Sequence, residues 1–100
     1  MRSFNSNSSG RSFDSATVSL VWGKAMVTAG YDPDDVRKDV CGAWIQKSAY
    51  GTTGQYGWEV DHIIPVAKRG TDVTSNLQPL QWKNNRGKGD DYPKWTCSVR

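Results

Sequence analysis

The stretch that decides the fold runs from Trp58 to Asp90 and reads WEVDHIIPVAKRGTDVTSNLQPLQWKNNRGKGD. Its first residues, WEVDHII, alternate apolar and polar side chains through Asp61 and stop at Pro65, as is typical of a strand with one face on the core. Asp61 and His62 therefore fall near the far end of this strand. Because neighbouring strand residues point to opposite faces, we expect these two side chains to diverge.

The rest of the stretch predicts a loop, a return strand and a helix. Residues 68–74 (KRGTDVT) are polar and contain a glycine turn. Residues 76–80 (NLQPL) fit a short strand in which Pro79 marks an edge or a strand end. A helix is expected from about residue 81 to residue 88, with basic residues near its end and Gly89 as its C-terminal cap.

The N-terminal half carries weaker signals. Residues 1–16 are rich in Ser, Asn and Gly and predict a flexible tail, because they offer few apolar groups to offset the entropy of ordering. Residues 17–27 (TVSLVWGKAMV) have a mixed period, and we favour a short strand over a helix. Residues 34–38 are expected to form a short helix after a proline turn, and Trp44 and Ile45 lie in a β-prone segment.

One hundred residues allow one compact domain with a modest core. We predict a small single domain of the α+β class over residues 17–100. Its ββα core motif spans residues 57–90, and the part before the motif is a β-rich or mixed extension. The two cysteines, Cys41 and Cys97, are too few for a four-sulfur zinc site. We expect reduced, buried thiols there, with one disulfide as the alternative.

Charge and hydropathy bound the function only loosely. The net charge of +3 and the pI of about 9.0 suit a polyanionic partner. No apolar run approaches the roughly 18 residues that cross a bilayer, and the N-terminus lacks the apolar middle of a signal peptide. We expect a soluble protein without a membrane partner and favour the cytoplasm. A longer parent chain, another secretion route and the oligomeric state stay open.

The motifs DHIIP, SNLQPL and NNRGKGD resemble the HNH nuclease family, whose fold is two antiparallel strands and a helix around one metal ion. Asp61-His62 stands where the family has its Asp-His pair, Asn76 where it has the central asparagine, and Asn85 where it has the helix His or Asn. The separations (76 − 61 = 15 and 85 − 76 = 9) are similar to those of the HNH domain in the guide-RNA nuclease of CRISPR systems. The resemblance covers about a third of the chain and implies a metal-dependent DNA endonuclease.

The resemblance implies a role for each residue, and the chemistry of the side chains agrees with it. Asp61 and Asn85 would bind one divalent cation, for which their hard oxygen ligands favour Mg²⁺, with Mn²⁺ as a substitute. His62, the only histidine, would be the general base, because imidazole is partly neutral near pH 7. Asn76 would hold the loop against the first strand and orient the imidazole. We expect Glu59 at the surface, with tuning of the metal through water as the alternative.

Basic residues around the motif are candidate contacts to the DNA backbone. They are Lys68, Arg69, Lys83, Arg86 and Lys88. Solvated surface charge is an equally good interpretation of these five residues. Lys88 would lie about one helical turn from Asn85 and hence near the metal.

The sequence departs from family members that bind a structural zinc through paired Cys-x-x-Cys knuckles. The helix-side pair would fall at Gln81 and Asn84, and neither is cysteine. We therefore predict no structural zinc and expect the aromatic-rich region upstream to stabilise the fold.

Two other functions stay open. The first is a colicin-like toxin or effector nuclease, with the serine-rich leader as a linker and an acidic immunity protein as partner. The second is a noncatalytic DNA-binding module with a vestigial metal site. Intact Asp61, His62 and Asn85 argue against the second, because DNA binding alone does not require a general base. Recognition site, strand preference and RNA activity are not readable from the sequence.

Overall fold

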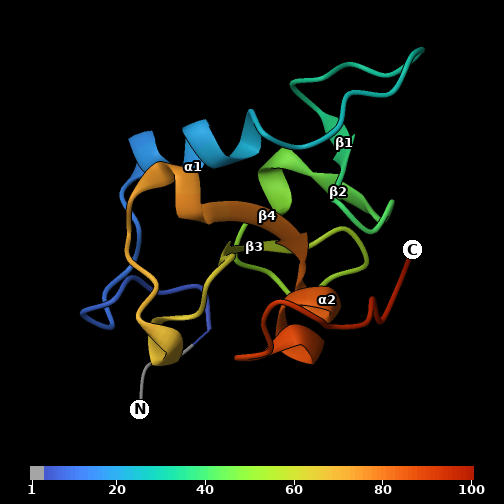
Figure 1. Cartoon of the computed structure of the whole chain (residues 1–100). Helices are drawn as coiled ribbons and strands as arrows, with labels where there is room; N and C mark the ends of the chain where they lie inside the picture. Colours follow the sequence, from blue (N-terminus) through green and yellow to red (C-terminus); the bar gives the residue numbers. More distant parts are fainter. Residues whose placement is uncertain (1–3) are drawn as a thin grey trace.

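The computed structural model describes residues 4–100 and contains two helices and two antiparallel hairpins (Figure 1). The helices and strands are α1 (Ser15–Trp22), β1 (Val36–Lys38), β2 (Trp44–Gln46), β3 (Trp58–His62), β4 (Leu77–Gln81) and α2 (Trp82–Lys88). Short 3-10 turns lie at η1 (Lys47–Ala49), η2 (Val66–Lys68) and η3 (Thr74–Asn76). The expected α+β class with a ββα motif is confirmed. None of the helices in the described part has the length and hydropathy of a membrane span.

The β3–β4 hairpin and α2 form the ββα motif. β3 pairs with β4 from Trp58 opposite Gln81 to His62 opposite Leu77. β4 continues directly into α2, and Gln81 caps the helix by accepting a hydrogen bond from the backbone N–H of Lys83 at 2.7 Å. α2 therefore folds back onto both strands. The three predicted elements of the motif are present, with small shifts at their ends.

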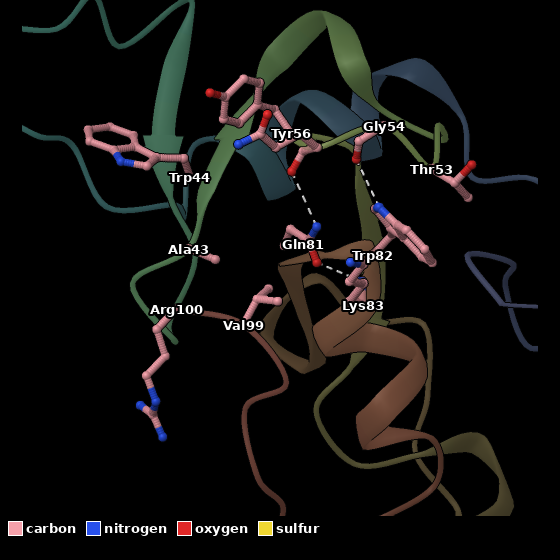
Figure 2. A pocket seen from close by; sticks show the side chains of 11 residues that line it. Ala43, Trp44, Thr53, Gly54, Tyr56, Gln81, Trp82, Lys83, Val99 and Arg100 are labelled. Carbon is pink, nitrogen blue, oxygen red and sulfur yellow. Dashed lines mark hydrogen bonds between the residues drawn. The ribbon is translucent and has the colours of Figure 1, made fainter.

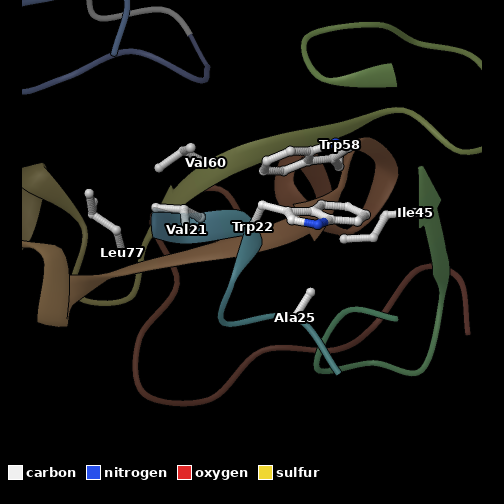
Figure 3. Close-up of a cluster of buried hydrophobic side chains, with 7 residues drawn as sticks. All are labelled: Val21, Trp22, Ala25, Ile45, Trp58, Val60 and Leu77. Carbon is white, nitrogen blue, oxygen red and sulfur yellow. The ribbon is translucent and has the colours of Figure 1, made fainter. Parts of the chain in front are cut away.

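The hydrophobic core lies between α1 and one face of the β3–β4 hairpin (Figure 3). Its buried members are Val21, Trp22, Ala25, Ile45, Trp58, Val60 and Leu77. The ring centroids of Trp22 and Trp58 lie 5.3 Å apart, so two of the five tryptophans supply the centre of the core. Strand alternation places Trp58 and Val60 on this face, and Glu59 and Asp61 on the opposite face, which packs against α2.

Helix α1 stands where a short strand was expected over residues 17–27, and that expectation was wrong. Asp14 caps the helix, because its carboxylate accepts a hydrogen bond from the backbone N–H of Thr17 at 2.7 Å. Val21 and Trp22 on the last turn are buried in the core. The cap and the burial of one helical turn together outweigh the β-prone side chains of the segment.

The second hairpin joins β1 and β2, with Val36 opposite Gln46 and Lys38 opposite Trp44. The short helix expected over residues 34–38 is therefore wrong over the last three of these positions. The β-prone segment around Trp44 does form a strand. In Figure 1 this hairpin lies beside the ββα motif, away from the end of β3.

Residues 4–14 make hydrogen bonds to the rest of the domain. A flexible tail was expected for residues 1–16, of which the first three lie outside the described residues. The side-chain oxygen of Asn5 accepts a hydrogen bond from the backbone N–H of Val60 in β3 at 2.8 Å. Ser8 is bonded to an aspartate in the β3–β4 loop. Hydrogen bonds attach this segment to the domain, and the low hydrophobicity of its sequence gave no sign of them.

Cys41 and Cys97 form a disulfide, so the expectation of two reduced thiols was wrong. The bond ties the segment after α2 to the turn between β1 and β2. Asn84 holds the same segment, because its side-chain oxygen accepts from the backbone N–H groups of Ser98 and Val99, each at 2.8 Å. Sequence spacing alone could not show that the two thiols meet.

Asp39 is a fully buried carboxylate that joins the β1–β2 hairpin to the start of α2. One oxygen accepts from the backbone N–H groups of Cys41 and Ala43. The other accepts from the backbone N–H of Gln81 and from the side-chain amide of Asn84, and all four bonds measure 2.9 Å. A polar network thus lies at the end of β4 and in α2, at the two positions, Gln81 and Asn84, where zinc-binding relatives would carry cysteine.

Candidate active site

α2 packs against the face of β3 that carries Glu59 and Asp61. The side-chain amide of Asn85 donates to Glu59 at 2.9 Å, and one turn later the ammonium of Lys88 lies 3.2 Å from Asp61. From Asn85 to Lys88 the helix advances about 4.5 Å, and from Glu59 to Asp61 the strand advances about 6.8 Å. The two contacts therefore follow one another along both α2 and β3. Asp61 and Asn85, 5% and 4% exposed, are thereby brought to the same side of the hairpin.

His62 ends β3 and points to the opposite face, as strand alternation predicts. Its Nε2 lies 2.8 Å from a carboxylate oxygen of Asp72, and its ring centroid lies 5.8 Å from that of Phe13. No hydrogen bond from the described residues reaches Nδ1. Because a carboxylate is an acceptor, a neutral His62 in this arrangement would carry its proton on Nε2, and its Nδ1 would be free to accept one.

Asp72 is held in place by the N-terminal segment. Its carboxylate accepts from the backbone N–H of Ser8 at 2.9 Å and from the Ser8 hydroxyl at 2.6 Å. Burial acts to raise the pKa of Asp72, but the hydrogen bonds from Ser8 and His62 outweigh it, and the pKa is lowered. Asp72 is therefore an ionised acceptor for the imidazole near neutral pH.

Asp61 is a buried carboxylate with two side-chain donors. Burial raises the pKa of Asp61, while the hydrogen bond from Gln78 and the positive charge of Lys88 act in the opposite direction. Gln78 stands directly opposite Asp61 in the β3–β4 register and donates to it at 2.9 Å. A bound cation would stabilise the negative charge of a buried carboxylate of this kind, because it offsets the hydration that burial removes.

Asn85 is oriented by Glu59. Its amide nitrogen donates to one oxygen of Glu59, and Arg86 donates to the other at 3.0 Å. The amide oxygen of Asn85 is consequently turned away from Glu59, and it accepts no hydrogen bond within residues 4–100. Glu59 is 3% exposed, so its expected place at the surface was wrong.

Asn76 holds the start of the loop after β3. Its side-chain oxygen accepts from the backbone N–H of Ile64 at 2.8 Å, and its nitrogen donates to the carbonyls of Ile64 and Thr71 at 3.1 and 2.9 Å. These bonds agree with the expected contact between loop and strand. The expected contact with the imidazole is absent among the described residues, because Asp72 bonds to His62 instead.

The five basic residues occupy different environments. Lys68, Arg69, Lys83 and Arg86 are exposed. Lys68 also donates to a backbone carbonyl just after α2, at 2.7 Å. Lys88, by contrast, is 1% exposed, so its ammonium does not lie on the surface expected for a backbone contact.

A pocket of about 330 Å³ opens at the start of α2 (Figure 2). The rings of Trp44, Tyr56 and Trp82 line it together with Gln81 and Lys83. None of the four residues predicted to carry the chemistry lines this pocket. The candidate active site is therefore the buried group at the other end of β3 and α2.

A sequence profile described as HNH endonuclease matches residues 39–91, more than half of the chain. The chain belongs to the HNH endonuclease family. No curated protein and no solved structure matches the chain. The HNH profile covers β3, β4 and α2, so it includes Asp61, His62, Asn76 and Asn85.

Membership of the HNH family implies a nuclease, and HNH nucleases act on nucleic acid and generally use a divalent metal ion. Within residues 4–100 no three His, Cys, Asp or Glu side chains gather as a metal-binding group. The oxygen donors predicted from the sequence are the carboxylate of Asp61, which is bonded to Gln78 and Lys88, and the amide oxygen of Asn85, which accepts no hydrogen bond from the described residues. Two hard oxygen donors fit a cation such as Mg²⁺, which keeps several water or phosphate ligands.

Two residues that contact the predicted site residues, Gln78 and Asp72, were not found from the sequence. Gln78 could have been found from the predicted hairpin, because the register sets it opposite Asp61. Asp72 lies in a polar loop and has no motif of its own. Only the folded loop shows that its carboxylate contacts His62.

Proposed function

We propose that this HNH domain is an endonuclease that hydrolyses DNA phosphodiester bonds with one divalent cation, Mg²⁺ or Mn²⁺. His62 is the general base, and Asp61 and Asn85 hold the cation. The observation that carries the proposal is the hydrogen bond between His62 and Asp72 at the end of β3, next to Asp61 in the chain. An imidazole oriented by a carboxylate is well suited to take a proton from water.

The reaction uses few protein groups. His62 takes a proton from water at Nδ1 while the water oxygen bonds to phosphorus. The bond from phosphorus to the 3′ oxygen breaks, and the leaving oxygen takes a proton from solvent. The products are 5′-phosphate and 3′-hydroxyl ends. Asp72, 2.8 Å from Nε2, stabilises the imidazolium that forms.

The donors near α2 support cation binding. A cation on Asp61 and Asn85 would attract the phosphate and offset negative charge on its oxygens. Asp61 supplies one negative charge and Asn85 none, so net positive charge remains for the substrate. Glu59 and Gln78 orient the two donors through their hydrogen bonds.

Asn76 and the exposed basic residues have supporting roles in this proposal. Asn76 is a positioning residue, because it ties Ile64 and Thr71 together in the loop that carries Asp72. The candidate contacts to the DNA backbone are Lys68, Arg69, Lys83 and Arg86, which are exposed. The net charge of +3 is consistent with binding to a polyanion.

A second candidate is a toxin or effector nuclease with the same chemistry. The disulfide between Cys41 and Cys97 favours it, since disulfides persist mainly in oxidising compartments and are rare in the cytosol. The disulfide thus favours an oxidising compartment over the cytoplasm that was favoured from the sequence. Co-purification with an acidic immunity protein would support this candidate.

The test of the proposed function is cleavage of supercoiled plasmid with Mg²⁺, with Mn²⁺ and with chelator. We expect cleavage only with a divalent cation. His62→Ala should lower the rate by about 10² to 10⁴, the usual contribution of a general base. A His62→Ala protein that cuts as fast as the parent would exclude the general-base role. DNA binding without cleavage under every condition would favour the noncatalytic binding module.

The cation ligands need a binding experiment as well. Asp61→Asn should weaken Mn²⁺ binding measured by calorimetry. The matched control is Asp34→Asn, which makes the same change at an exposed position. Equal Mn²⁺ affinity in the two variants would remove Asp61 from the proposed ligands.

A further inference from the structure

Lys88 places an ammonium group on the carboxylate that is proposed to hold the cation. Its Nζ lies 3.3 Å from Oδ1 and 3.2 Å from Oδ2 of Asp61, and it donates to the backbone carbonyl of His62 at 3.0 Å. The Lys88 side chain is 1% exposed and that of Asp61 is 6% exposed. Lysine is almost never buried to this degree unless it is paired, so the ammonium and the carboxylate depend on each other.

The position of Lys88 conflicts with a cation on Asp61. Both carboxylate oxygens lie within hydrogen-bonding range of the ammonium, and a divalent ion at those oxygens would meet a like charge at short range. Little water is available to screen the repulsion at buried groups. Gln78, the other donor to Asp61, is uncharged and adds no repulsion of this kind.

We propose that Lys88 competes with the divalent cation for Asp61, so that cation binding moves the ammonium off the carboxylate. This inference rests on the proposed function. Lys88 ends α2 on a flexible four-carbon stem and is followed by Gly89, so its side chain can turn outward without a change in the hairpin. The displaced ammonium then reaches the phosphate that the cation attracts. Binding of the cation and of the DNA backbone is coupled through this one side chain.

The experiment measures Mn²⁺ affinity of the full chain by calorimetry at pH 8, without DNA. Lys88→Met removes the charge and keeps much of the length of the side chain. Lys94→Met makes the same change at an exposed lysine outside the site and is the control. We expect Lys88→Met to bind Mn²⁺ at least about tenfold more tightly than the control, the size of effect that one close charge has on a neighbouring ionisation. Equal or weaker binding by Lys88→Met overturns the inference.

A thermal measurement covers the case in which Lys88→Met is unstable. Loss of the ammonium leaves Asp61 buried without its partner, so the variant should melt below the control. Saturating Mn²⁺ should then raise its Tm by more than it raises that of Lys94→Met. If Lys88→Met does not fold without metal, Lys88→Gln, which keeps a donor for the His62 carbonyl, takes its place with the same expectation. A smaller or equal rise in Tm contradicts the competition.

Asp61→Asn separates this inference from the proposed function. If the parent binds Mn²⁺, Asp61→Asn loses it and Lys88→Met matches the control, the cation site stands and the competition fails. If neither the parent nor Lys88→Met binds Mn²⁺, the proposed cation site fails and the inference fails with it.

Discussion

Nε2 of His62 lies 2.8 Å from a carboxylate oxygen of Asp72. His62 is the last residue of β3, and Asp72 lies in the loop that joins β3 to β4. The same carboxylate is bonded to Ser8 from the other end of the chain. The only histidine in the protein is therefore oriented by a loop that the N-terminal segment holds in place.

Asp72→Asn should lower the single-turnover cleavage rate by about 10- to 100-fold, which is less than the contribution of about 10² to 10⁴ expected for the general base itself. The amide no longer stabilises the imidazolium by charge. Mn²⁺ affinity should stay within about twofold of the parent, since Asp72 does not contact the proposed ligands. Asp34→Asn, at an exposed position, should cleave at the parental rate. An unchanged rate for Asp72→Asn would show that the carboxylate does not serve the base.

The lowered pKa of Asp72 predicts a pH-dependent contribution to stability. The folded-state pKa lies below the ordinary value of 3.8, so the unfolded chain binds the proton more tightly. The stabilising contribution is present above the unfolded pKa and is lost as pH falls through the folded pKa. Urea unfolding from pH 6 down to pH 2.5 should show a stability gap between the parent and Asp72→Asn that narrows below about pH 4. A gap that stays constant with pH would contradict the shift.

Asp39→Asn should destabilise the fold by about 2 to 4 kcal/mol, because an amide cannot satisfy four donors that now face a buried carboxylate. Chemical denaturation measures the effect. Asp91→Asn is the control, since Asp91 is exposed and its substitution should change stability by less than about 0.5 kcal/mol. Similar stabilities for the two variants would mean that the network around Asp39 contributes little.

Replacing both cysteines with serine should lower the free energy of unfolding by about 2 to 5 kcal/mol, because the disulfide closes a long loop in the unfolded chain. Reducing agent should destabilise the parent by a similar amount and leave the Cys41→Ser/Cys97→Ser variant unaffected. Thermal melts with and without dithiothreitol provide the measurement. A parent protein insensitive to reduction would argue against the bond.

The ββα motif was predictable because its signals are local. Alternation through Asp61 marks β3, and Gly89 caps α2. Pro79 was expected at an edge or a strand end, and it lies inside β4, which is an edge strand of the two-stranded sheet. Order and spacing of the Asp-His pair and the two asparagines then pointed to the HNH family, which the profile match supports. Strand alternation also gave the divergence of Asp61 and His62, which lie on opposite faces of β3.

The features that were not predicted from the sequence depend on contacts between residues that are distant in sequence. α1 was missed although Asp14 is a good capping residue, because Val18 and Leu20 fit a strand equally well. The pairing of Cys41 with Cys97 depends on where the segment after α2 runs. The burial of Lys88 depends on how α2 docks on β3, and a helical pattern alone presents it as a surface charge.

The attachment of the first residues affects how this domain can be transplanted. A fragment cut at the limits of the family match, residues 39–91, would carry every residue of the HNH motif. It would lack Ser8, which holds Asp72, and Asn5, which bonds to the backbone of β3. A chimaeric protein built from this nuclease therefore needs the segment with Asn5 and Ser8 as well as the motif. The shortest fragment that keeps both contacts begins before Asn5.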